Sequence, residues 1–304
     1  MAEQRAAANG SLTVSRLQIL ATALLFSTGG AVIKAIDLTS WQVAAFRSGV
    51  AAFAILLMLP SSRRRWDLGT VAVGIAYAGA LICYVLANKL TTAASTIFLY
   101  STSPLYVLLL GPWLLKEPLR RRDLVFMLVV GVGFFMVLLG VGPAGATAPK
   151  PFEGNILAAV GGLFFALVVI GLRWTSRKDP GRSGGPTAAI AAGNLIALAI
   201  CLPLALPVVE SRPLDWVLIG YLGVFQIGLA YALLAAGLRK IPALEASLLI
   251  LIEPVLNPVW AWWGHGERPG RLSLAGGVLI LATIAARAVL EARYRTQTSR
   301  PVGQ

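Results

Sequence analysis

Ten long apolar runs constrain what this chain can fold into. They cover residues 17–36, 40–60, 68–88, 93–115, 123–141, 153–173, 187–208, 215–238, 243–264 and 271–291. Each run is long enough to cross a hydrocarbon layer of about 30 Å. Backbone groups in lipid must be hydrogen-bonded within a helix or between the strands of a closed barrel. The runs lack the alternating pattern of barrel strands, so they are expected to be helices. The sequence therefore predicts an all-α polytopic membrane protein with ten transmembrane helices.

Composition excludes several other classes of protein. Of the 304 residues, 57% are hydrophobic and 13% are charged, whereas soluble domains have roughly 45–50% and about 25%. A soluble enzyme, a secreted disulfide scaffold and a disordered chain are therefore disfavoured. The two cysteines, Cys83 and Cys201, lie within apolar runs, and His265 is the single histidine. These residues predict no metal site and no disulfide framework, and we expect no cofactor.

Positive charges are distributed unevenly between the loops. When the N-terminus is placed in the cytoplasm, most of the 26 lysines and arginines fall on the cytoplasmic side, in clusters such as 63–65, 120–122 and 173–182. Cytoplasmic loops of membrane proteins carry such an excess. We therefore expect a multi-pass membrane protein with both termini in the cytoplasm. The formal net charge of +13 then reflects topology and contact with anionic lipid, and no nucleic-acid partner is expected.

The two halves of the chain resemble each other. A constant shift of the sequence aligns Pro104 with Pro254, Trp113 with Trp263 and Glu117 with Glu267. Each half contains five runs, an odd number, so the two halves are expected to cross the membrane in opposite directions. Such inverted-topology repeats are typical of transporters, in which the binding site lies near the midplane between the repeats.

The predicted organisation has five parts. They are an N-terminal cytoplasmic tail at 1–16, a first five-helix repeat at 17–141, an extracytoplasmic loop at 142–152, a second five-helix repeat at 153–291 and a C-terminal cytoplasmic tail at 292–304. Two repeats within one chain can complete a pathway without a second copy. We therefore expect a monomer.

Two charged residues within the runs each have two interpretations. Arg47 is the one cation that we assign to the membrane interior and to neither side of it, and because such a charge costs about 2.5–3.5 kcal/mol on insertion scales, it should face the bundle interior. It either anchors a substrate carboxylate or is held in a buried pair with a carboxylate of the protein or with the carbonyls of a kinked helix. Glu253, near the centre of the ninth run, either meets a substrate ammonium or carries a proton, or else it pairs with Arg47 or a neighbouring hydroxyl.

Prolines occur at equivalent places in the two halves. Pro104 lies within the fourth run, and Pro254 and Pro258 lie within the ninth. A proline inside a helix removes the hydrogen bond to the carbonyl four residues earlier. We expect hinges at these prolines. The freed carbonyls either only bend the helix or also accept hydrogen bonds from a ligand.

Polar and aromatic residues form stripes on several of the predicted helices. The candidate substrate-binding residues are Tyr77 and Tyr84 on the third, Tyr100 and Ser103 on the fourth, Gln226 on the eighth, and Asn257 and Trp260 with Glu253 on the ninth, together with Arg47. Inward-facing stripes of this kind predict a cavity with aromatic walls and a few hydrogen-bonding groups. The other interpretation is hydrogen bonding between helices, worth about 0.6 kcal/mol on average.

The chain resembles the ten-helix members of the drug/metabolite transporter superfamily, which are built from two EamA-type repeats. The second repeat carries the most specific pattern, AlaSer at 246–247, GluPro at 253–254 and then Glu267. Arg47, early in the second run, also matches. The first repeat has SerPro at 103–104 instead of GluPro, so any role of the glutamate has no symmetric counterpart.

Within that superfamily the chain is most similar to bacterial exporters of amino acids, especially aromatic ones, over residues 84–118. The resemblance implies alternating access by rocking of helix groups around a central cavity. A zwitterionic substrate needs one anionic and one cationic contact, which Glu253 and Arg47 would supply. Our leading hypothesis is therefore an exporter of neutral or aromatic amino acids. Nucleobases, nucleosides or other small drug-like metabolites remain the alternative, because tyrosines and side-chain amides suit them equally well.

Other functions fit the sequence less well. A pump for cationic drugs needs a carboxylate in the first helix, and residues 17–36 contain none. A sugar-phosphate carrier needs several cations in its pore, and an enzyme needs a larger set of ionisable groups than Arg47 and Glu253. The inverted repeat argues against a receptor, because a receptor does not need two equivalent states that open to opposite sides of the membrane. The sequence leaves open whether transport is proton antiport or facilitated diffusion.

Overall fold

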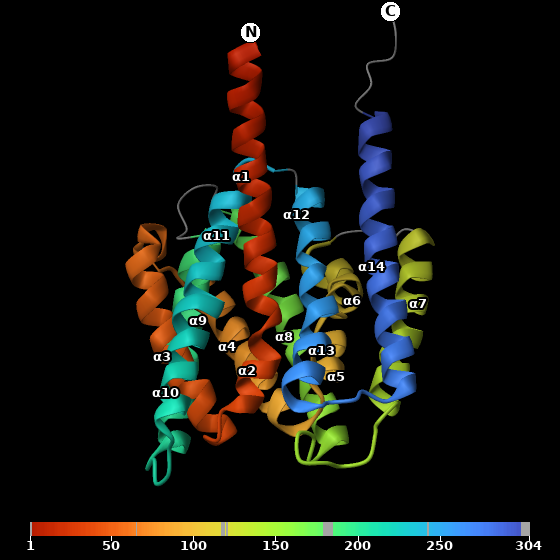
Figure 1. Ribbon diagram of the computed structural model, residues 1–304. Helices are drawn as coiled ribbons and strands as arrows, with labels where there is room; N and C mark the ends of the chain where they lie inside the picture. Colours follow the sequence, from red (N-terminus) through yellow and green to blue (C-terminus); the bar gives the residue numbers. More distant parts are fainter. Residues whose placement is uncertain are drawn as a thin grey trace, which may run out of the picture.

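The structure, a computed structural model, is a bundle of helices with both ends of the chain on one side (Figure 1). It describes residues 2–64, 66–116, 119, 121–178, 185–241 and 243–298. Apart from an isolated bridge between Gly145 and Ala148, these residues form helices and their connections. Glu117, the predicted counterpart of Glu267, lies outside the described residues.

The first half of the chain crosses the bundle five times. Its helices are α1 (Ala2–Ser27), α2 (Gly29–Ala35), α3 (Ser40–Met58), the short η1 (Pro60–Arg63), α4 (Leu68–Leu90), α5 (Ala93–Tyr100), α6 (Ser103–Leu114) and α7 (Arg121–Leu139). The first crossing starts at the end of the bundle that carries both termini (Figure 1).

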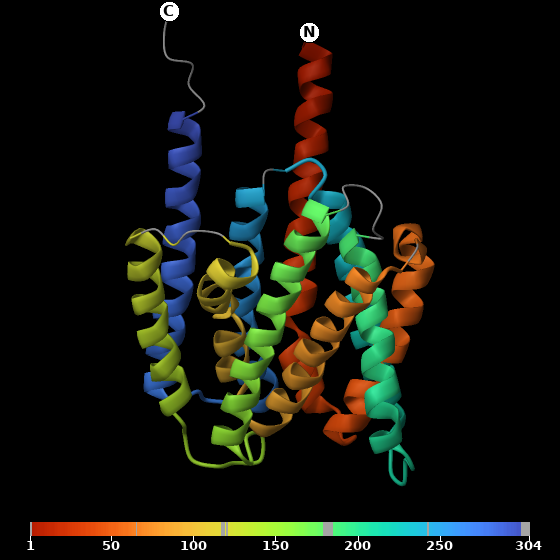
Figure 2. The same ribbon diagram turned by 180° about the vertical axis from the view of Figure 1, so that it is seen from behind.

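The second half also crosses five times, but it starts from the opposite end of the bundle (Figures 1 and 2). Its helices are α8 (Pro151–Lys178), α9 (Gly185–Ala205), α10 (Pro213–Tyr221), the π-helical η2 (Leu222–Leu229), α11 (Ala230–Gly237), α12 (Ala243–Ile250), α13 (Ile252–His265) and α14 (Arg271–Thr298). The two halves therefore traverse the bundle in opposite senses.

Nine of the ten predicted runs are, within the described residues, helical segments long and apolar enough to cross a membrane. The remaining run, predicted as one helix over 243–264, is divided at Leu251 into α12 and α13. The fourth run is likewise divided at 101–102 into α5 and α6, and the first at Thr28 into α1 and α2. Three crossings that the sequence predicts as continuous helices are thus broken near their middles.

The prolines occupy different positions from those expected. Pro104 is the second residue of α6 and Pro254 the third of α13, so both stand in the first turn of a new helix. The first-turn N–H groups of a helix have no intrahelical acceptor, so a proline costs nothing there. Of the three prolines, only Pro258 lies inside a helix, as predicted. The prolines at 104 and 254 mark helix breaks and do not kink continuous helices.

Small residues allow close helix contacts in the core. A Cβ on Gly193 of α9 would lie 2.7 Å from the carbonyl oxygen of Gly74 on α4 and 2.6 Å from Cδ1 of Tyr77. In the outer pair, a Cβ on Gly276 of α14 would lie 2.7 Å from the carbonyl oxygen of Gly133 on α7. Glycine at such points is the usual means by which membrane helices approach closely.

Candidate functional site

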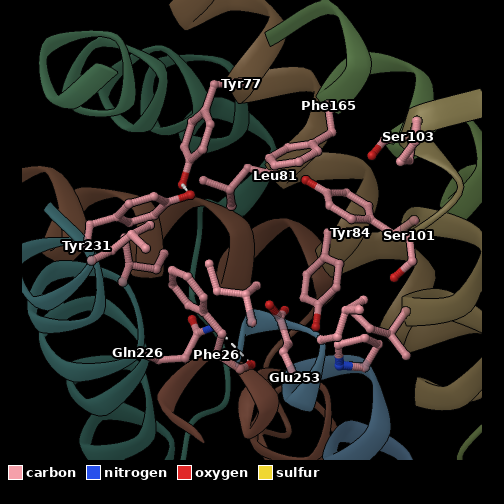
Figure 3. Close-up of a pocket in the computed structure, with 18 of the residues that line it drawn as sticks. Phe26, Tyr77, Leu81, Tyr84, Ser101, Ser103, Phe165, Gln226, Tyr231 and Glu253 are labelled. Atoms are coloured by element: carbon pink, nitrogen blue, oxygen red, sulfur yellow. Dashed lines mark hydrogen bonds between the residues drawn. The ribbon is translucent and has the colours of Figure 1, made fainter. Parts of the chain in front are cut away.

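A cavity of about 340 Å³ lies among the helices, and both halves of the chain contribute to it (Figure 3). The breaks in the fourth and ninth crossings border it, through Ser101 and Ser103 on one side and Leu251 and Glu253 on the other. Its volume is within the range of small-molecule sites in proteins. The helix breaks therefore place polar side chains and chain ends around one interior space.

Arg47, on α3, lines the cavity with a side chain that is only 4% exposed. Its Nη2 donates to Oε1 of Gln226 at 3.0 Å, and its guanidinium carbon lies 6.0 Å from the centre of the Tyr84 ring. Nε and Nη1 have no hydrogen-bond partner in the part of the chain that the structure describes. A buried donor without an acceptor costs about 1–3 kcal/mol, so this arrangement is unusual unless a ligand supplies the acceptor.

Glu253 lies in the first turn of α13 and also lines the cavity (Figure 3). No ion pair joins it to Arg47, and among the described residues it has neither a hydrogen bond nor an ion pair recorded. The positive end of the α13 dipole favours its negative charge at this position. Of the two interpretations of these charged residues, the structure does not support a pair between them.

Aromatic rings form most of the remaining wall. The hydroxyl of Tyr77 donates to that of Tyr231 at 3.3 Å, and the rings of Tyr84 and Tyr100 pack edge to face with centres 5.5 Å apart. Phe165 continues this wall, with its ring centre 5.2 Å from that of Tyr100. Such rings present flat apolar surfaces and only a few polar atoms to a ligand.

Most of the predicted site residues meet around this cavity. Its lining includes Arg47, Tyr77, Tyr84, Tyr100, Ser103, Gln226 and Glu253, together with the predicted hinge residues Pro104 and Pro254. Pro258 is not among the lining residues. The structure thus brings together residues that five different crossings contribute.

Asn257 and Trp260 were expected in the lining and are not part of it. Asn257 is fully buried and donates from Nδ2 to the hydroxyl of Tyr84 at 3.3 Å. Trp260 donates from Nε1 to Oγ of Ser27 at 2.9 Å. They lie one and two turns further along α13 than Glu253, where α13 packs against α2 and α5. They support the wall from outside the cavity.

Sequence reasoning did not select several residues that line the cavity. Tyr231, Phe26 and Phe165 are the aromatic ones. Tyr231 lies on α11, past the π-helical segment, so the spacing of a regular helix from Gln226 does not place it correctly. Phe26 and Phe165 each lie in the first helix of their half of the chain, α1 and α8, and the presence of a phenylalanine in both of these helices is a signal that could have found them.

Residues 15–139 and, separately, residues 152–286 match the EamA-like transporter family. The chain belongs to this family. As an EamA-like transporter it is a polytopic membrane protein and not an enzyme, and the two matched segments correspond to two repeats.

Relatives of this EamA-like transporter cover nearly its whole length. An uncharacterized protein of Pseudomonas aeruginosa is 30% identical over 84% of this chain and 88% of its own. The pseudopaline exporter CntI of the same organism is 26% identical over 89% of this chain and 94% of its own. A protein of known crystal structure shares the fold, with a TM-score of 0.59 and 19% identity over 93% of this chain and 99% of its own.

Proposed function

We propose that this EamA-like transporter exports neutral amino acids with aromatic or bulky side chains. One observation carries the proposal. Arg47 and Glu253 line the same cavity, and among the described residues neither neutralises the other. A zwitterion brings a carboxylate for Arg47 and an ammonium for Glu253, and so satisfies both charges without adding net charge.

The aromatic walls support the choice of side chain. Tyr84, Tyr100 and Phe165 form a continuous series of ring contacts between the charged residues and α8. An aromatic or branched substrate side chain gains apolar and edge-to-face contact there. A small polar amino acid would leave that surface uncovered.

The direction of transport and its mechanism are further parts of the proposal. One relative is named an exporter, which supports outward movement of the substrate. The two halves traverse the bundle in opposite senses and share one cavity (Figure 1). This arrangement supports an inverted repeat that exposes the cavity alternately to the two sides by rocking of the helix groups.

The proposed location is a bacterial inner membrane, with both termini in the cytoplasm. Helix α1 begins, and α3, α8 and α11 end, at the end of the bundle that carries the termini (Figure 1), and basic residues such as Arg16, Arg63, Arg173 and Lys240 lie on or next to these segments. The positive-inside rule assigns that end to the cytoplasm, and anionic lipid is the partner we propose for it, with no nucleic acid. The cavity is complete within one chain, which supports a monomer.

A second candidate is an exporter of nucleobases, nucleosides or similar metabolites. The tyrosine rings and the amide of Gln226 would suit a base. However, the Gln226 oxygen already accepts from Arg47, and its nitrogen lies 3.5 Å from the carbonyl oxygen of Phe26. The oxygen and the nitrogen of the amide are therefore both already hydrogen-bonded, so Gln226 is poorly placed to form two hydrogen bonds with the edge of a base. Recognition of a carboxylate by Arg47 is favoured instead.

Counterflow in proteoliposomes tests the proposed function. Vesicles are loaded with unlabelled phenylalanine, labelled phenylalanine is added outside, and threonine, a nucleoside, a quaternary ammonium and a sugar phosphate are added as competitors. We expect label to accumulate and amino acids alone to block it. Block by the nucleoside would favour the second candidate. No accumulation by folded protein would reject the amino-acid proposal.

A further inference from the structure

The eighth crossing contains an irregular segment beside Arg47. Residues 222–229 form a π-helix, η2, between two α-helical segments. A Cβ on Gly223 would lie 2.5 Å from Cβ of Val50, and one on Gly228 would lie 2.8 Å from Cβ of Ala54. The irregular segment is thus in direct contact with α3, one and two turns beyond Arg47. π-Helical turns are rare and are frequent at functional sites.

Gln226 is held in this segment with a defined orientation. Its side chain is only 4% exposed. Because an arginine can only donate, the amide oxygen must face Nη2 of Arg47, at 3.0 Å. The amide nitrogen then points to the break between α1 and α2, 3.5 Å from the carbonyl oxygen of Phe26. It would lie 2.8 Å from a Cβ on Gly29, so only glycine leaves room for it.

A neutral amide has a specific advantage at this place. It fixes the guanidinium through one nitrogen and leaves Nε and Nη1 without a partner in the described structure. A carboxylate of the same length would also fix Arg47, but it would neutralise the charge and compete with any anionic ligand. A hydrophobic side chain would leave the guanidinium without a hydrogen-bond acceptor to orient it.

We propose that Gln226 is a positioning residue that presents Arg47 to the carboxylate of the substrate. This inference rests on the proposed function and deepens it. Gln226 acts through Arg47, and its neutrality keeps the cavity selective for a ligand that brings its own negative charge. The π-helical segment places the amide between Arg47 and the break in the first crossing.

Two substitutions separate positioning from structure. Gln226→Met is close in shape and removes the acceptor, and Gln226→Glu keeps an acceptor but cancels the charge. In phenylalanine counterflow, we expect each to raise the half-saturation concentration about tenfold or more, with the maximal rate of Gln226→Met within about twofold of wild type. Competition by phenylalaninamide, which lacks the carboxylate, should not change in Gln226→Met.

Gln42→Met is the matched control, because Gln42 is a buried glutamine of α3 that donates to the carbonyl of Ala205 and does not line the cavity.

A readout without a substrate keeps this inference separate from the proposed function. Modification of Arg47 by butanedione, followed by mass spectrometry, reports how its guanidinium is held. We expect faster modification in Gln226→Met and slower modification in Gln226→Glu, with Gln42→Met like wild type. If phenylalanine counterflow fails in wild type but the variants keep this order of modification rates, the proposed substrate is wrong and the positioning role stands. Equal modification in all variants, or a Gln226→Met effect on maximal rate alone, would overturn the positioning role.

Discussion

Lys34 Nζ lies 3.0 Å from Oε1 of Glu267, and both side chains are only 3% exposed. The ammonium also donates to the backbone carbonyls of Asn88, Thr91 and Thr147, at 2.6–2.8 Å. Oε2 of Glu267 accepts from the backbone N–H that opens α5 at 2.8 Å. This ion pair therefore connects α2, the α4–α5 and α13–α14 connections and the loop before α8, all at the end of the bundle opposite the termini (Figure 1).

Removing one partner of the Lys34–Glu267 pair should strongly destabilise the protein. Removing one partner of a buried ion pair leaves an uncompensated charge and costs about 3–5 kcal/mol. We expect Lys34→Met and Glu267→Gln each to lower the melting temperature of the purified protein clearly. The double variant Lys34→Met/Glu267→Leu should lose less than the sum of the single variants. Strict additivity in thermal unfolding would show that the pair is not coupled.

Arg47 should behave in the opposite way. Its Nε and Nη1 have no partner among the described residues, so its burial does not stabilise the bundle by itself. We expect Arg47→Met to keep or raise the melting temperature while phenylalanine counterflow is lost. Arg47→Lys retains the charge but not the planar fork, and should raise the half-saturation concentration about tenfold. A fall in melting temperature like that of Lys34→Met would indicate a structural role instead.

Glu253 is the candidate for coupling to protons. It lines the cavity without a partner in the described structure. We expect Glu253→Gln to abolish any transport driven by a pH gradient and to leave phenylalanine exchange measurable, because the amide cannot release a proton. The two activities are compared in the same vesicles, with and without the gradient. Aggregation of the variant on size exclusion would instead favour a structural role for Glu253.

Gly193 should not tolerate a side chain. A Cβ there would lie 2.6 Å from Cδ1 of Tyr77, a ring that lines the cavity. We expect Gly193→Ala to separate α4 from α9, at a cost of about 1–3 kcal/mol, and to displace Tyr77. Gly131→Ala on α7 is the matched control, because nothing lies within 4 Å of its Cβ position. Equal melting temperatures for the two variants would contradict the close packing described for α4 and α9.

The sequence predicted the crossings and the family because both depend on strong local signals. Runs of apolar residues report helices that lie in lipid, and the placement of Arg47 and Glu253 within such runs requires them to face the interior. The cavity confirms that they share one interior space, and it contains seven of the nine residues that we selected. Their roles in binding remain predictions.

Details that depend on contacts between distant segments could not be predicted. The π-helical segment at Gln226 changes the helix face on which Tyr231 lies relative to Gln226, and no local sequence pattern predicts this segment. Periodicity placed Asn257 and Trp260 on the face of Glu253, but it does not show where that face leaves the cavity. The Lys34–Glu267 pair joins the first crossing to the connection that follows the ninth, and the sequence had indicated Glu267 only as a marker of the repeat and of the family pattern.

The proposed function requires the cavity to recognise a carboxylate and an ammonium on one aromatic molecule. The most direct test compares three competitors in phenylalanine counterflow by wild-type protein: phenylalanine itself, phenethylamine without the carboxylate, and 3-phenylpropionate without the ammonium. We expect phenylalanine to compete at a concentration at least about tenfold lower than either analogue, since each analogue leaves Arg47 or Glu253 without a counter-charge. Equal competition by all three would contradict it.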